Sequence, residues 1–141
     1  MAEQKKYEYW LGRRKKSTAI VKLYQQGSWN VTLETKNWKK KTLEEFFGWN
    51  RYLLEDALYS FSVLGEDMKD RFDVEIKVYW GGLKGQAEAI SLWLARALVN
   101  FNNEYRPQLK PYGLLKRNSK EKERKKYGLR KARKSPQWTK R

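Results

Sequence analysis

Cysteine and histidine are both missing from this sequence of 141 residues. Without cysteine the chain can form neither a disulfide framework nor a thiolate metal site. Without histidine it also lacks the commonest general base, and with both absent it lacks the usual ligands of zinc. Carboxylates, lysines and hydroxyls are the side chains that remain for chemistry. We therefore expect no enzyme activity, no metal site and no cofactor.

Long apolar segments are lacking as well. The longest, around residues 89–99, is short and interrupted by Arg96, and the first ten residues, MAEQKKYEYW, do not resemble a signal peptide. The sequence predicts a soluble protein without a secretion signal, and its length is that of one ordinary domain.

Acidic residues are scarce relative to basic ones. The chain has 32 Lys and Arg but only 16 Asp and Glu, a net charge of +16, which points to nucleic acid or an anionic membrane surface as partner. Residues 116–141 hold 13 cations and 2 anions, a net +11, which leaves 19 cations and 14 anions, a net +5, for residues 1–115. This contrast predicts a folded body, 1–115, and a basic tail, 116–141.

The tail has too few apolar side chains to fold by itself. It also contains Gly128 and Pro136, which disfavour one continuous helix. Thirteen mutually repelling cations favour a nucleic-acid partner, with a membrane-surface tether or a nuclear-localisation segment as alternatives. Trp138 lies among these cations, where its indole ring could stack on a base.

Strand patterns occupy the N-terminal third and the middle of the body. The segment RFDVEIKVYW alternates strictly between an apolar and a polar face and predicts a half-buried strand, with Trp80 on the apolar face. The segments STAIVKLY and SWNVTLE also favour strands, and Gly27 between them indicates a hairpin turn.

Helical spacing follows in two segments. Residues 51–64 place apolar side chains three and four apart, with Asn50 as the expected cap, and residues 85–101 form a wider apolar face that ends at Phe101. We expect the second helix to pack centrally on the sheet and Trp29, Trp80 and Trp93 to lie in the core. The predicted fold class is α/β, in the α+β sense.

Two features could bind phosphate. The segment GGLKGQ joins a strand to a helix N-terminus, which can present N–H groups to an anion, but it matches neither the Walker loop nor the dinucleotide fingerprint, and a plain turn is the favoured interpretation. A phosphate-handling enzyme that uses Lys84 is the corresponding alternative. The cluster RRKK, comprising Arg13, Arg14, Lys15 and Lys16, is either a solvated surface or a set of phosphate contacts.

Three segments, in the same order and with nearly the same spacing, resemble one protein family. They are YWLGRRKKSTA, GGLKGQAEAI followed by ARAL, and ERKKYGLRKARKSPQWTKR. Together they are similar to the bacterial form of small-subunit ribosomal protein nine. The ending is the most specific, because a basic run, Pro-Gln, an aromatic residue, a hydroxyl residue and a terminal Lys-Arg all have their counterparts here.

The resemblance implies a two-layer body resembling the second domain of ribosomal protein five, docked on ribosomal RNA (rRNA) and neighbouring proteins in the small-subunit head. It further implies a tail that threads toward peptidyl-site tRNA, with Thr139, Lys140 and Arg141 near the anticodon stem-loop. The expected rRNA ligands are Arg13, Arg14, Lys15, Lys16, Arg124, Lys125, Lys126, Arg130, Lys131, Arg133 and Lys134. The source would be a bacterial cytoplasm or an organelle.

The chain departs from the family pattern at four positions. Trp80 stands where a third glycine is usual, Glu88 replaces a small residue, Asn118 replaces a common aspartate and Lys16 replaces a common serine. A free-standing RNA-binding regulator with a basic tail is the alternative function, and unlike the ribosomal protein it would tolerate a folded domain appended after Arg141.

Overall fold

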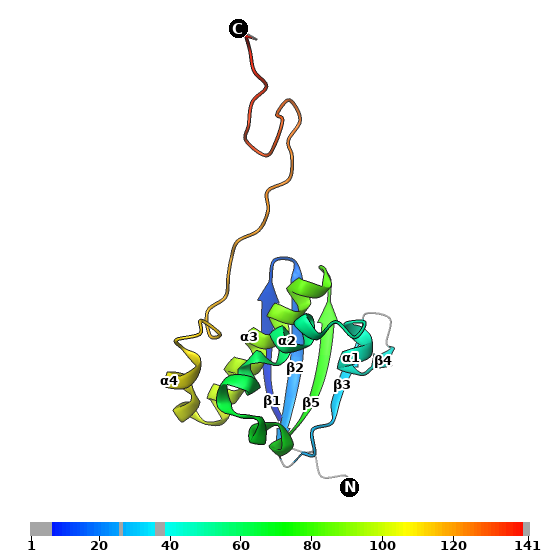
Figure 1. Ribbon diagram of the computed structural model, residues 1–141, viewed down its shortest axis with the longest axis vertical. Helices are drawn as coiled ribbons and strands as arrows, with labels where there is room; N and C mark the ends of the chain where they lie inside the picture. Colours follow the sequence, from blue (N-terminus) through cyan, green and yellow to red (C-terminus); the bar gives the residue numbers. More distant parts are fainter. Residues whose placement is uncertain (1–6, 26, 36–38, 140–141) are drawn as a thin grey trace.

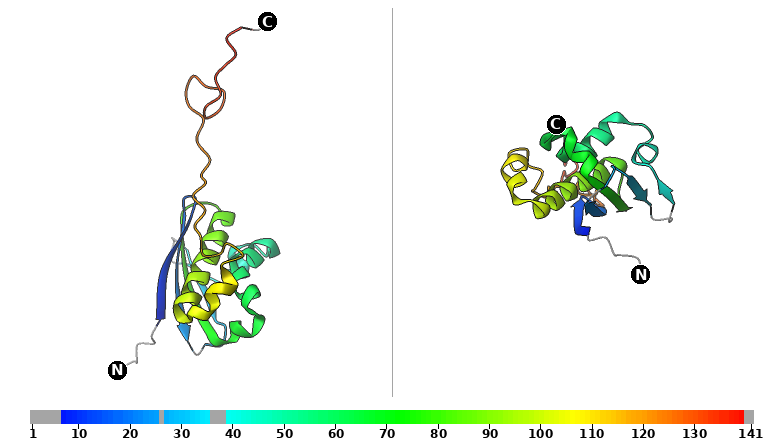
Figure 2. Two further views of the ribbon diagram at one scale, coloured as in Figure 1. Left: turned by 90° about the vertical axis from the view of Figure 1, so that its left-hand side faces the viewer. Right: turned by 90° about the horizontal axis from the view of Figure 1, so that it is seen from below.

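The computed structural model describes residues 7–25, 27–35 and 39–139. In this part of the chain, one sheet of five strands carries its helices on one face (Figures 1 and 2), which confirms the predicted mixture of helices and strands. The strand order is β1-β2-β5-β3-β4. The strands span Tyr7–Arg14 (β1), Ser17–Gln25 (β2), Val31–Glu34 (β3), Lys40–Lys41 (β4) and Phe72–Tyr79 (β5).

The longest helix, α3, lies across strands β1 and β2, and α2 packs beside it. Short 3₁₀ segments, Glu66–Arg71 and Asn103–Tyr105, precede β5 and α4. Within the described residues, no helix combines the length and the apolar character needed to cross a bilayer. The helices span Leu43–Phe46 (α1), Arg51–Leu64 (α2), Leu83–Phe101 (α3) and Arg106–Leu109 (α4).

The core lies between the sheet and α3. Trp93 on α3 is completely buried, and the inward positions of β5 follow the predicted alternation from Phe72 to Val78. Strand β1 approaches α3 closely at Gly12, where an added Cβ would lie 2.2 Å from the carbonyl oxygen of Ala89. A side chain at this position would push the helix off the sheet, because well-packed interiors have little free space.

The predicted hairpin between β2 and β3 is wrong. Strand β5 lies between them, antiparallel to β2 and parallel to β3. Gly27 makes this possible, because its backbone passes so close to β5 that an added Cβ would lie 2.2 Å from the amide nitrogen of Asp73. Turn residues thus marked the end of β2 correctly but did not reveal which strand would pair with it.

Two aromatic residues are more exposed than predicted. Trp80 is 63% exposed because β5 ends at Tyr79 and Trp80 adopts a left-handed conformation, with φ of 59°, that turns the chain toward α3. Phe101, in the last turn of α3, is 40% exposed although its ring contacts that of Phe72. The core prediction is confirmed for Trp93, and Trp29 is half-buried against the ring of Phe61.

Beyond α4, the chain turns and leaves the body. Residues 117–139 contain neither helix nor strand, and nearly all of their side chains are exposed. This segment extends past the end of the body at which the β1–β2 turn and the start of α3 are found (Figures 1 and 2). The path of the tail therefore starts beside two features that the sequence singles out, RRKK and GGLKGQ.

Candidate nucleic-acid interface

The RRKK cluster forms the tip of the β1–β2 hairpin. Arg14 pairs with Ser17 in the strand register, so Lys15 and Lys16 form a two-residue turn between them. Lys15 has a φ of 50°, a conformation that short hairpin turns require at their first central position. Arg13, Lys15 and Lys16 are exposed, and they present three positive charges to solvent at the hairpin tip.

Arg14 is positioned differently from the rest of the cluster. Side chains alternate along a strand, so Arg14 lies on the same face as Gly12 and points toward α3. Its guanidinium Nε bonds to the carboxylate of Glu88, and the side chain is only 13% exposed. Its Nη1 group donates to the carbonyl oxygens of Asn118 at 3.2 Å and Lys120 at 2.9 Å. Arg14 therefore fixes the start of the tail to the body.

A second arginine holds the same junction. Arg96 of α3 donates a hydrogen bond from Nη2 to the carbonyl oxygen of Leu115 at 3.2 Å. In addition, the side chain of Asn118 accepts a hydrogen bond from the amide of Lys120 at 3.0 Å. We call residues 115–120 the tail root. Two body arginines and a local turn set the direction in which the tail leaves.

Contacts at the tail root explain the departure from the family pattern at Glu88, and they include the departing residue Asn118. Glu88, in place of a small residue, supplies the carboxylate that binds Arg14. Asn118 supplies a carbonyl that the same guanidinium binds. Sequence reasoning missed this role of Arg14 and Arg96 because the bonded residues lie up to 106 positions apart. The only signal for Arg96 was that it interrupts the apolar run of residues 89–99.

The predicted rRNA ligands of the tail are all exposed. One of them is paired, because Arg133 forms two hydrogen bonds with Glu123, at 3.0 and 2.5 Å. This bond lowers the pKa of Glu123 and raises that of Arg133. A turn around Gly128, which has a φ of 77°, closes the loop between the two residues. The other predicted ligands are Arg124, Lys125, Lys126, Arg130, Lys131 and Lys134.

The described end of the tail lies far from the body (Figure 1). The ring of Trp138 is 98% exposed and Thr139 is exposed as well. An uncovered indole ring is available for stacking, as its position among cations suggested. Lys140 and Arg141, the other two predicted tRNA ligands, lie outside the described residues.

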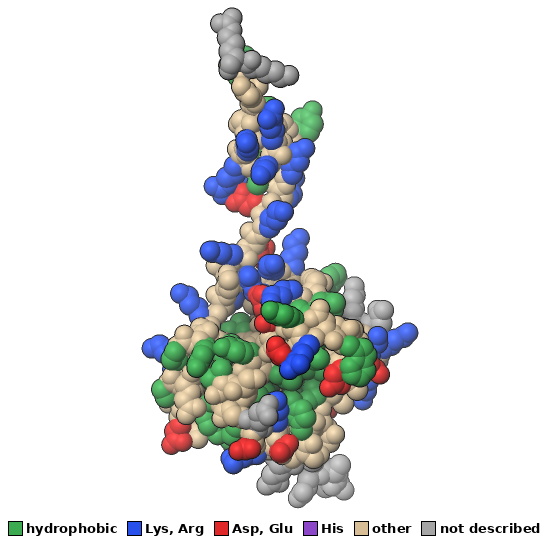
Figure 3. All heavy atoms as spheres, viewed as in Figure 1, with side chains coloured by type: hydrophobic (Ala, Val, Ile, Leu, Met, Phe, Trp, Pro, Cys, Tyr) green, Lys and Arg blue, Asp and Glu red, His purple; other side chains and the backbone are tan. Residues whose placement is uncertain are grey.

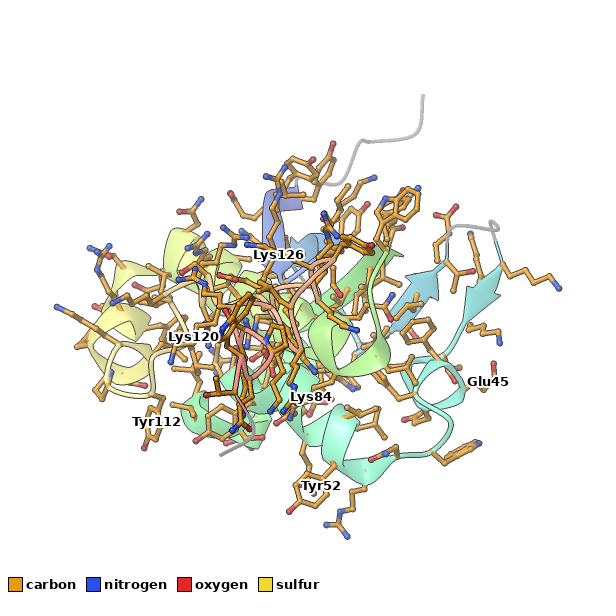
Figure 4. The ribbon with its side chains drawn as sticks, turned by 90° about the horizontal axis from the view of Figure 1, so that it is seen from above. Glu45, Tyr52, Lys84, Tyr112, Lys120 and Lys126 are labelled. Atoms are coloured by element: carbon orange, nitrogen blue, oxygen red, sulfur yellow. The ribbon has the colours of Figure 1, made fainter. Side chains whose placement is uncertain are left out.

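The basic groups gather at one end of the molecule. Lys and Arg side chains follow the tail and the adjoining end of the body (Figure 3), and the view along the tail shows Lys84 of α3 together with Lys120 and Lys126 of the tail itself (Figure 4). Lys84 is ion-paired with Asp56, and this hydrogen bond raises its pKa. Surface cations concentrated in this way attract a polyanion over distances comparable to the Debye length, about 8–10 Å at ordinary salt.

A compact α/β body with a mostly unpaired cationic extension defines a nucleic-acid-binding protein. Comparison with known proteins gives the particular family. Residues 12–141 match the family described as ribosomal protein S9/S16. The small ribosomal subunit protein uS9c of Emiliania huxleyi is 44% identical over 131 residues, which cover 93% of this chain and 94% of that protein.

The chain therefore belongs to the ribosomal protein S9/S16 family, in its bacterial and organellar form, which confirms the resemblance found in the sequence. It is a structural, RNA-binding component of the ribosome and not an enzyme. That result removes the phosphate-handling enzyme as an alternative.

Proposed function

We propose that this protein is a structural constituent of the small ribosomal subunit that binds rRNA in the subunit head and extends its tail to peptidyl-site tRNA. The observation that carries the proposal is that the hairpin tip, the tail root and the tail share one end of the molecule (Figure 1). A single RNA surface can therefore meet all three at once. The body, residues 1–115, would fold like the second domain of ribosomal protein five and dock on rRNA and neighbouring proteins.

The tail, residues 116–141, acts as the element that enters the RNA. Its cations repel one another in the free protein, and rRNA phosphates relieve that repulsion. From Gly128 to Arg141 an extended chain spans at most about 50 Å, at roughly 3.3–3.6 Å per residue. That reach is enough to carry Thr139, Lys140 and Arg141 well away from the docked body, to the backbone of the anticodon stem-loop.

Limited proteolysis of the free protein tests the proposed boundary. The described tail residues have exposed backbone and form neither helix nor strand, so trypsin should cut first between Lys116 and Lys134 and leave the body intact. Added small-subunit rRNA should slow these cuts. Equal resistance of tail and body without RNA would contradict the boundary.

Neutralising the hairpin tip tests its contact with rRNA. We expect the triple change Arg13→Gln, Lys15→Gln and Lys16→Gln to lower the slope of log affinity against log salt by about 2–3, or about 0.7–0.9 per phosphate. Arg14 is left unchanged because it holds the tail root. The readout is rRNA binding across a salt series.

The matched control replaces three exposed lysines at the far edge of the sheet, Lys39, Lys40 and Lys41, by glutamine. Both triple variants lose three positive charges, so a nonspecific charge effect would change both slopes equally. The same slope change in both variants would show that the hairpin tip is a solvated surface.

A further inference from the structure

The N-terminus of α3 has no side chain to cap it. The capping residue is Gly82, and the first turn contains no acidic residue. The first N–H groups of a helix have no partner within the helix, and together with the helix dipole they carry about half a positive charge. In most helices a serine, threonine, aspartate or asparagine side chain accepts from these groups. The 19-residue α3 leaves them open to an anion.

This helix end lies on a basic groove of about 470 Å³. The β1–β2 turn, the start of α3 and the beginning of the tail line the groove together. Its cations are Lys15, Lys16, Lys84 and Lys122, and Glu121 is the one carboxylate among the lining residues that the structure describes. Since Lys84 is held by Asp56, the other three lysines are the ones that an anion in the groove would meet.

A buried, unpaired hydroxyl beneath the same helix end is a second indication of a ligand site. Ser17 lines the groove, is 1% exposed, and its Oγ has no hydrogen-bond partner in the described structure. The hydroxyl lies against Gly81 of the turn and Gly85 of α3, since an added Cβ would be 1.9 Å from it at Gly81 and 2.7 Å at Gly85. Buried polar groups are rarely left unpaired, and each exception calls for an explanation.

We propose that this groove binds one phosphate of the rRNA backbone. The N–H groups at the start of α3 and the lysines of the groove hold it, with the Ser17 hydroxyl at the floor. The inference rests on the proposed rRNA binding and adds the N–H groups of α3 and the Ser17 hydroxyl to the lysines that the two basic runs supply. An rRNA phosphate fits better than a free nucleotide because the groove connects the hairpin tip with the tail, both of which are cationic, and so lies on the path of a polymer.

The substitution Gly82→Asp tests the site directly. An added Cβ at Gly82 meets no atom within 4 Å, and its φ of −104° suits any residue. Aspartate at this position caps the helix and favours the fold, while its carboxylate takes the place of the phosphate. Two controls accompany it. Gly82→Ala adds a side chain without charge, and Gln108→Glu makes the same change in charge on exposed α4.

The full-length variants are titrated with transcribed small-subunit rRNA across a salt series. We expect Gly82→Asp to bind about 5- to 10-fold more weakly than the parent, with a slope lower by about 0.7–0.9, while both controls stay close to the parent. The thermal unfolding temperature of Gly82→Asp should not fall. An affinity and slope equal to those of Gln108→Glu would overturn the inference and leave the proposed function intact. A shallow slope for the parent protein would overturn both.

The substitution Ser17→Ala gives an independent readout. This change removes an unpaired buried hydroxyl, so it should raise the unfolding temperature of the free protein. The same hydroxyl is a proposed phosphate ligand, so its loss should weaken rRNA binding about threefold. A rise in stability with unchanged rRNA affinity would contradict the site.

Discussion

Raising the salt concentration from 50 to 200 mM should weaken rRNA binding by the intact chain about a thousandfold more than binding by a variant whose tail cations are replaced by glutamine. Each phosphate contact contributes about 0.7–0.9 to the slope, and six or seven contacts give roughly 4–6. A slope difference of about 5 over a fourfold change in salt corresponds to about a thousandfold. The seven replaced residues are Arg124, Lys125, Lys126, Arg130, Lys131, Arg133 and Lys134.

Two controls separate charge from structure. A variant with lysine in place of the three arginines among these seven residues keeps every charge, so its slope should match that of the intact chain. The unfolding temperature of the body should be the same in both variants, because the replaced side chains are exposed and pack on no core residue. A glutamine variant with the parent's slope would show that the tail does not lie on phosphates.

Deleting Thr139, Lys140 and Arg141 should weaken peptidyl-site tRNA binding by about 1–3 kcal/mol, the range of hydrogen bonds to charged groups. That loss corresponds to roughly 5- to 150-fold in affinity. The favourable contacts are expected from the cationic side chains of Lys140 and Arg141. Phosphate contacts do not read sequence, and the loss should therefore be similar for different tRNAs. Looser maintenance of the reading frame should accompany it.

The measurement is tRNA affinity for purified small subunits that carry either the full or the truncated protein, with several tRNAs at matched salt. Arg141→Lys is the informative control, because it keeps the charge but loses the forked donor pair of arginine. Subunit assembly should stay nearly normal in both variants. Unchanged affinity for every tRNA would rule out the proposed role of the three terminal residues.

Local patterns predicted β2, β3, β5, α2 and α3, but they missed β1 and the short elements α1, β4 and α4. The alternation from Phe72 to Val78 defined β5, and the apolar face of residues 85–101 defined α3, which begins only two residues earlier, at Leu83. These patterns work because burial on one face imposes a period on the sequence. Strand pairing carries no such period, which is why the insertion of β5 between β2 and β3 could not be predicted from the turn at Gly27.

The charged groups of the candidate site were visible in the sequence, but their convergence was not. RRKK and the tail lie far apart in the sequence, and the packing of α3 on β1 together with the hydrogen bonds of Arg14 and Arg96 brings them to one end of the molecule. The separate role of Arg14 arises because its side chain lies on the face of β1 that points toward α3, where it meets the carboxylate of Glu88. Composition identifies which residues are charged, whereas tertiary structure decides which of them remain free for RNA.

The position of the tail in the assembled subunit is the central claim, and directed hydroxyl-radical probing tests it. Because the chain has no cysteine, a single substitution gives one attachment point for an iron chelate. Ser135→Cys places the probe in the exposed tail, and Ser62→Cys places it on exposed α2 as control. In small subunits with tRNA in the peptidyl site, the probe at position 135 should cleave rRNA and the anticodon stem-loop, and the probe at position 62 should leave the tRNA intact. Incorporation of both proteins without tRNA cleavage from position 135 would contradict the account.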